Sequence, residues 1–99
     1  MALVRESMGA MTKAVDVRIT GRVQGVSFRA RTQARAQQLG VTGWVRNEPD
    51  GSVAGHFEGT AEAVDELVAW CRHGPAYAEV DEVDVVDSEP TGAEGFGAG

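Results

Sequence analysis

The stretch Gly21-Arg22-Val23-Gln24-Gly25-Val26-Ser27-Phe28-Arg29 marks the point at which the hydrophobic period of the sequence changes. Before it, residues 14–20 alternate apolar and polar side chains, which is the period of a half-buried strand. After it, apolar or small side chains recur every three or four residues over 28–39, as on one helix face, and Gly40 ends the pattern. The nine residues are therefore predicted to be a turn that leads from a strand into a helix.

The two glycines of this turn allow backbone N–H groups to point at a small ligand beside the N-terminus of the helix, where an anion binds well. Arg29 falls in the first helical turn, where the helix dipole disfavours a cation by up to about 1 kcal/mol. A bound phosphate would reverse this penalty, because the guanidinium could donate two hydrogen bonds to the phosphate oxygens. The alternative is an ordinary tight turn with Arg29 as a solvated surface charge.

The remaining sequence predicts three more strands and a second helix. The second helix has Thr60 as its N-cap and ends at Gly74. The element order is that of an α+β, ferredoxin-like split βαβ sandwich (βαββαβ), with two helices on one face of an antiparallel sheet. The predicted strands cover residues 14–20, 41–47, 52–58 and 79–87.

Residues 1–13 show neither the strand period nor the helix period of apolar side chains, and they are interpreted as a flexible N-terminal leader. Residues 14–99 are expected to form a single domain. Within it, residues 88–99 are rich in glycine and poor in apolar side chains, so they are either weakly ordered or a short edge strand.

Asn47 ends the second predicted strand. The first and second strands run in the same direction, because a helix crosses between them, and both end at one rim of the sheet. Asn47 is therefore a candidate to lie beside the turn at 21–29, and the alternative is that it only starts the turn at 48–51.

The charges are unevenly distributed along the 99 residues, which carry a net charge of −6. Residues 1–46 contain eight Lys or Arg against two acids, whereas residues 47–99 contain one Arg against thirteen acids. The first half attracts anions, and the acidic second half would repel a long polyanion. The balance favours a small phosphorylated or carboxylated ligand over nucleic acid.

The composition suits one small cytoplasmic domain, and a monomer is expected. No apolar run reaches the length of a membrane span, and no signal pattern opens the chain. The single cysteine, Cys71, is predicted to be packed in the core. No Cys/His cluster has the spacing of a metal site. His56 is interpreted as a strand surface residue and His73 as a helix C-terminal residue, and the acids of residues 79–87 as a solvated strand edge.

Three linked motifs closely resemble the acylphosphatase family: Gly21-x-Val23-Gln24-Gly25-Val26-x-Phe28-Arg29, Gly43-Trp44-Val45-Arg46-Asn47 and Asp50-Gly51-x-Val53. The resemblance covers about Val15 to Val85. It implies a ferredoxin-like domain in which the loop cradles a phosphate, Arg29 binds it and Asn47 positions a water molecule. The backbone amides assigned to the phosphate are those of Gln24, Gly25, Val26, Ser27 and Phe28.

The activity that the resemblance implies is hydrolysis of small acyl phosphates to a carboxylate and phosphate, without a metal or other cofactor. One departure is the C-terminal end, where family members commonly have a short strand with aromatic and basic residues and only Phe96 is similar here. Two rival functions remain. One is a non-catalytic module that binds an acyl or carbamoyl phosphate. The other is an RNA-binding ferredoxin-like domain, which the net charge and the lack of an aromatic motif on the central strands disfavour.

Overall fold

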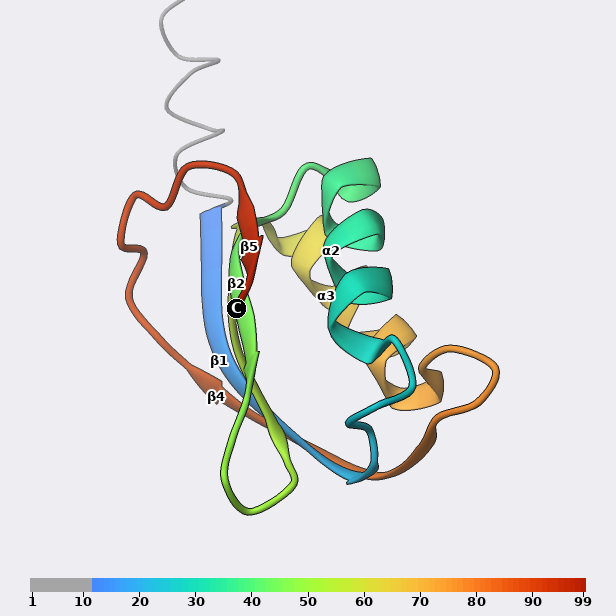
Figure 1. The fold of residues 1–99 in the computed structure, drawn as a ribbon. Helices are drawn as coiled ribbons and strands as arrows, with labels where there is room; N and C mark the ends of the chain where they lie inside the picture. The colour runs from blue at the N-terminus through green and yellow to red at the C-terminus, as the bar shows by residue number, and fades with distance from the viewer. Residues whose placement is uncertain (1–11) are drawn as a thin grey trace, which may run out of the picture.

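A five-stranded sheet carries two helices on one of its faces in the computed structural model, which describes residues 12–99 (Figure 1). The strand order is β4-β1-β3-β2-β5, and the first four strands pair antiparallel. The ferredoxin-like fold class predicted from the sequence is confirmed. Of the two alternatives for residues 88–99, the structure has the short edge strand, β5, which pairs parallel to β2, so the sheet is mixed and not purely antiparallel. The elements are β1 (Thr12–Arg22), α2 (Phe28–Leu39), β2 (Thr42–Asn47), β3 (Val53–Thr60), α3 (Ala61–His73), β4 (Glu79–Asp87) and β5 (Phe96–Ala98).

β1 is longer than predicted at both ends. It begins at Thr12, so the last two residues of the predicted leader 1–13 belong to the strand, and residues 1–11 lie outside the described part of the chain. It ends at Arg22, because the pairing with β4 continues past an irregularity between Thr20 and Gly21. Gly21 has φ of 122°, and a Cβ there would lie 2.1 Å from the carbonyl oxygen of Glu79. Only glycine fits this close approach of two strands.

The core fills the space between the sheet and the two helices. Phe28, the first residue of α2, is 1% exposed and its ring centroid lies 5.8 Å from that of Trp70 on α3. Cys71 is fully buried, as predicted, and burial raises the pKa of its thiol to about 12. Thr60 caps α3 as predicted, since its hydroxyl accepts a hydrogen bond from the N–H of Ala63 at 3.1 Å. The strands contribute Val15, Val17, Ile19, Val45, Val53 and Phe57 to this core.

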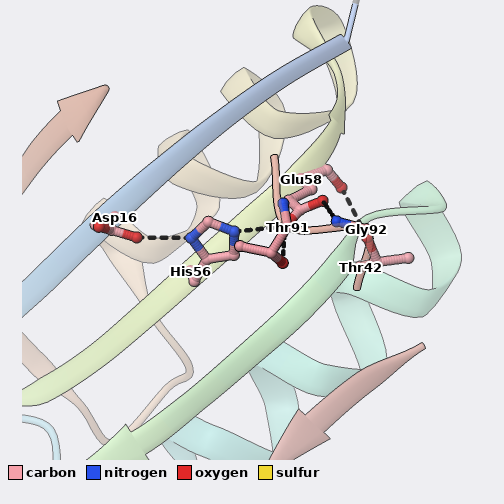
Figure 2. Close-up of polar contacts among 6 residues, drawn as sticks. All are labelled: Asp16, Thr42, His56, Glu58, Thr91 and Gly92. Atoms are coloured by element: carbon pink, nitrogen blue, oxygen red, sulfur yellow. Dashed lines mark hydrogen bonds and ion pairs between the residues drawn. The ribbon is translucent and has the colours of Figure 1, made fainter. Parts of the chain in front are cut away.

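The opposite face of the sheet holds a buried charged cluster around His56 (Figure 2). The interpretation of His56 as a surface residue is wrong: it is 4% exposed, and Glu58 beside it is 5% exposed. Both ring nitrogens of His56 are bonded, Nδ1 to Asp16 Oδ1 and Nε2 to Glu58 Oε2, each at 2.6 Å. The ring also stacks on Trp44 with centroids 6.4 Å apart. The alternating pattern of β3 separates the two sides of the strand, but it does not show whether other parts of the chain cover the polar side. From the pattern alone, the side that carries His56 is therefore expected to face solvent.

The cover is the connection between β4 and β5, which runs along the side of the sheet away from the helices (Figure 1). Glu58 binds this connection through its carboxylate. It accepts hydrogen bonds from the N–H of Thr91 at 2.7 Å, from the Thr91 hydroxyl and from the N–H of Gly92 at 3.2 Å (Figure 2). The buried carboxylate therefore attaches this connection to the sheet, and the chain continues from there into β5 at the edge beside β2.

The contacts within the cluster shift the pKa values of its two buried ionisable groups. Burial alone would raise the pKa of Glu58, but hydrogen bonds from Thr91, His56 and Gly92 outweigh it and lower the pKa to about 2. Burial alone would lower the pKa of His56, but its hydrogen bonds to Asp16 and Glu58 outweigh burial and raise it above the ordinary 6.5. Both carboxylates thus favour the protonated form of the ring that lies between them.

We expect the free energy of unfolding to fall as the pH rises above about 6.5. The raised pKa of His56 stabilises the fold fully below its unfolded pKa, and this contribution is lost as the pH rises through the folded pKa. The lowered pKa of Glu58 contributes above about pH 4.5 and is lost as the pH falls towards 2. Urea unfolding from pH 5 to 9 measures the slope.

The test variant is His56→Gln, in which the free energy of unfolding should no longer fall above pH 6.5. The matched control is His73→Gln, in which the fall should remain. His73 is the second histidine of the chain and is exposed at the end of α3. A fall of equal size in His56→Gln would assign the pH dependence to another group.

Candidate active site

The loop between β1 and α2 has an unusual backbone conformation. Gly25 has φ of 77° and Ser27 has φ of 65°, which is the left-handed region. Ser27 is the only residue other than glycine with positive φ among the described residues, and this conformation costs it on the order of 1 kcal/mol. Ser27 also stands at the N-cap of α2 without making a side-chain cap hydrogen bond. The loop is therefore shaped at a local cost, as is common at functional sites.

The N–H groups of this loop are available to a ligand. Within residues 12–99, no hydrogen bond uses the backbone N–H of any of residues 24–28 as its donor. Positive φ at alternate residues also lets successive N–H groups turn towards one side. A hollow lies against the loop, and Gly25, Ser27, Phe28 and Arg29 are among the residues that line it. The structure thus brings four of the predicted site residues to one concave surface.

Positive charge gathers at the same loop. The acid-free stretch 17–46 contains six arginines, and three of them form ion pairs: Arg18 with Asp50, Arg35 with Glu66 and Arg46 with Glu48. The other three have no ion pair within residues 12–99, and they flank the loop: Arg22 precedes it, and Arg29 and Arg31 follow it. The electrostatic field around the loop therefore attracts a small anion.

The C-terminal strand forms one wall of the hollow, which the sequence did not predict. Ala98 of β5 lines it, and Gln33 of α2 donates from Nε2 to the carbonyl oxygen of Phe96 at 2.7 Å. The guanidinium of Arg29 donates a hydrogen bond from one terminal nitrogen to the carbonyl oxygen of Gly99. The only sequence signal for this wall was Phe96, whose ring packs 5.9 Å from that of Phe57.

Asn47 lies at the rim where the loop begins. It is the last residue of β2, it is exposed, and it shares its side of the strand with Val45, whose side chain is fully buried under the helices. The side chain of Asn47 makes no hydrogen bond within the described residues, and Asn47 is not among the residues that line the hollow. The loop and this end of β2 are joined by Gln24, whose side chain reaches the turn that follows Asn47.

These groups can hold a small tetrahedral dianion. Free backbone donors at a helix N-terminus and a guanidinium supply several hydrogen bonds and positive charge around one point. An uncommitted amide at the neighbouring strand end can orient a water molecule. Within residues 12–99 there is no group of three or more His, Cys, Asp or Glu side chains that could hold a metal ion, and no helix is long and apolar enough to cross a membrane.

The fold and the loop define a ferredoxin-like domain with a hollow between its first strand and first helix, lined in part by residues whose backbone N–H groups have no hydrogen-bond partner within residues 12–99. A comparison with known families matches residues 15–97 to the acylphosphatase family. An acylphosphatase from a Nocardioides species is 56% identical over 89 residues, which cover 90% of each chain. An acylphosphatase from Rubrobacter xylanophilus is 59% identical over 87 residues, covering 86% of this chain and 78% of the relative.

Among solved structures, an acylphosphatase from Coxiella burnetii superposes with a TM-score of 0.88 and 28% identity, covering 92% of this chain and 96% of that chain. This chain belongs to the acylphosphatase family. The resemblance found in the sequence motifs is confirmed by these matches.

We expect inorganic phosphate to perturb the loop more than any other part of the protein. In a ¹⁵N-HSQC titration, the amide signals of residues 24–28 and the Nε–H signal of Arg29 should shift together along one saturating curve, because one ligand contacts all of them. Chloride at matched ionic strength is the control. Equal shifts at the exposed strand β4 would indicate a nonspecific salt effect in place of a site.

Proposed function

We propose that the protein hydrolyses small acyl phosphates at the β1–α2 loop, with Arg29 and Asn47 as its catalytic residues. The observation that carries the proposal is the set of uncommitted N–H groups of residues 24–28 beside Arg29, in a chain of the acylphosphatase family. The relatives are named as enzymes, which favours hydrolysis over the alternative of a binding module without turnover.

The phosphate is held by main-chain donors and one guanidinium. Phosphoryl transfer passes through a loose transition state with charge spread over the equatorial oxygens, and fixed donors aimed at these oxygens provide most of the catalysis. We assign this role to the backbone amides of Gln24, Gly25, Val26, Ser27 and Phe28 and to Arg29. These groups supply positive charge in a fixed geometry, so the scheme requires no metal ion or cofactor.

Asn47 orients the attacking water. Its amide oxygen accepts a hydrogen bond from the water and holds it in line with the bond to the leaving group. The leaving group is a carboxylate, whose conjugate acid has a pKa of about 4 to 5 like those of Asp and Glu, so no general acid has to protonate it. The proton of the water passes to a phosphate oxygen of the substrate, and the products are the carboxylate and phosphate.

We further propose that the protein works on its small substrate as a cytoplasmic monomer, without nucleic acid. The support is chemical. The only cysteine is a buried free thiol, and β4 presents exposed acids that would repel a nucleic acid.

Replacing Arg29 by Ala should lower kcat/KM for acetyl phosphate by about 10³-fold or more, because it removes the charge that matches the transition state. Inorganic phosphate should no longer inhibit. The control is Arg31→Ala, which removes a nearby exposed arginine that does not line the hollow and should change kcat/KM little. A phosphate-release assay with circular dichroism of both variants separates loss of chemistry from loss of fold. Near wild-type hydrolysis by Arg29→Ala would refute the assignment.

Replacing Asn47 by Ala should separate binding from turnover. Phosphate should still inhibit competitively with a similar inhibition constant, because the loop and Arg29 are intact. The value of kcat should fall by about 10²-fold or more, because the water is no longer placed. Steady-state kinetics with phosphate as inhibitor measures both. Unimpaired kcat would mean that another group positions the water.

A further inference from the structure

The side chain of Gln24 turns away from the hollow and towards the β2–β3 turn. Its Nε2 donates to the carbonyl oxygens of Glu48 and Ser52, each at 2.9 Å. Both donors of the amide are therefore used, in a half-buried position. Gln24 is one of the residues whose backbone N–H is proposed to face the phosphate. Its backbone therefore belongs to the loop, while its side chain binds the turn.

The two acceptors lie immediately beyond Asn47. Glu48 follows Asn47 directly, and Ser52 precedes Val53, the residue that pairs with Asn47 across β2 and β3. The Ser52 carbonyl also accepts from the N–H of Glu48 at 2.8 Å. The amide of Gln24 thus sits at the mouth of the hairpin, one residue from the proposed water-positioning side chain.

The shape of the turn does not depend on Gln24. Asp50 accepts hydrogen bonds from the N–H and the hydroxyl of Ser52, at 3.0 Å and 2.6 Å. Arg18 on β1 binds Asp50 from outside the turn. These contacts stabilise the conformation of the turn and attach it to β1. Within residues 12–99, however, the two bonds of Gln24 are the only hydrogen bonds between the loop 23–27 and residues 47–53.

We propose that Gln24 is a positioning residue for acyl phosphate hydrolysis, which sets the distance between the phosphate-binding amides and Asn47. The inference rests on the function proposed above. In-line attack requires the water and the phosphorus to meet at a defined separation, and a misplacement of about 1 Å costs on the order of 10²-fold in rate. The sheet brings the loop and the end of β2 to one rim. The phosphate would be held by the loop and the water by the end of β2, so the side-chain contact between the loop and the turn holds the final separation.

The inference predicts a separation of kinetic effects that a structural role would not produce. Loss of the Gln24 amide leaves the loop N–H groups and Arg29 in place, so phosphate affinity is retained. It lets the loop and the turn shift relative to each other, so kcat falls. A merely destabilised fold would instead lower the amount of active protein without a change in kcat per folded molecule.

The test is Gln24→Met, which keeps the length of the side chain and removes both donors. For acetyl phosphate, kcat should fall about 10- to 100-fold, and the inhibition constant of inorganic phosphate should change by less than about 3-fold. Gln37→Met is the matched control, because Gln37 is exposed on α2 and lies outside the hollow. It should leave both values unchanged. If Gln24→Met does not fold, Gln24→Asn serves the same purpose, because the shorter amide cannot reach both carbonyls.

A double-mutant cycle identifies the residue through which Gln24 acts. In an Asn47→Ala background, Gln24→Met should have no further effect on kcat, because no positioned water is left to misplace. Multiplied effects of the two substitutions would overturn the inference, as would an unchanged kcat in Gln24→Met or a loss that is confined to phosphate affinity. Absence of hydrolysis in the wild-type protein would refute the proposed function itself, and that outcome is distinct from all of these.

Discussion

The pairing of β3 between β1 and β2 is the constraint on which the site depends. Both neighbours run antiparallel to β3, so β1 and β2 point the same way and their C-terminal ends meet at one rim. The loop after β1 and Asn47 at the end of β2 are brought to that rim by the sheet hydrogen bonds. Without this arrangement, the loop proposed to bind the phosphate and the amide proposed to position the water would not lie at the same rim.

The loop itself is locally unfavourable and is held by its surroundings. Ser27 has positive φ, and Arg29 places a cation in the first turn of α2. Phe28 stands between them and is buried in the core against Trp70, which anchors the start of the helix. Burial of one phenyl ring is worth about 2 to 3 kcal/mol, which is enough to offset costs of about 1 kcal/mol each.

The two faces of the sheet are connected through the C-terminal segment. Buried Glu58 holds Thr91 and Gly92 on the face away from the helices, and the chain then continues into β5 at the sheet edge. β5 forms a wall of the hollow beside Arg29. A charged cluster that takes no part in the proposed chemistry therefore helps to define the shape of the site. The cost of burying His56 and Glu58 is reduced because the two side chains are hydrogen-bonded to each other and to further polar partners.

The sequence alone determined the order of the first six elements, the fold class and Arg29 as a candidate anion ligand, because period, glycine position and capping are local properties that the chain carries within a few residues. The role expected of Asn47 came from the resemblance of the sequence motifs to the acylphosphatase family. Only the tertiary structure decided that His56 is buried, that β5 closes the hollow and that Gln24 joins the loop to the turn. Each of these depends on at least one partner between 24 and 70 residues away along the chain, as in the bonds from Gln24 to Glu48 and from Arg29 to Gly99. Such contacts are formed by packing, and no local pattern encodes them.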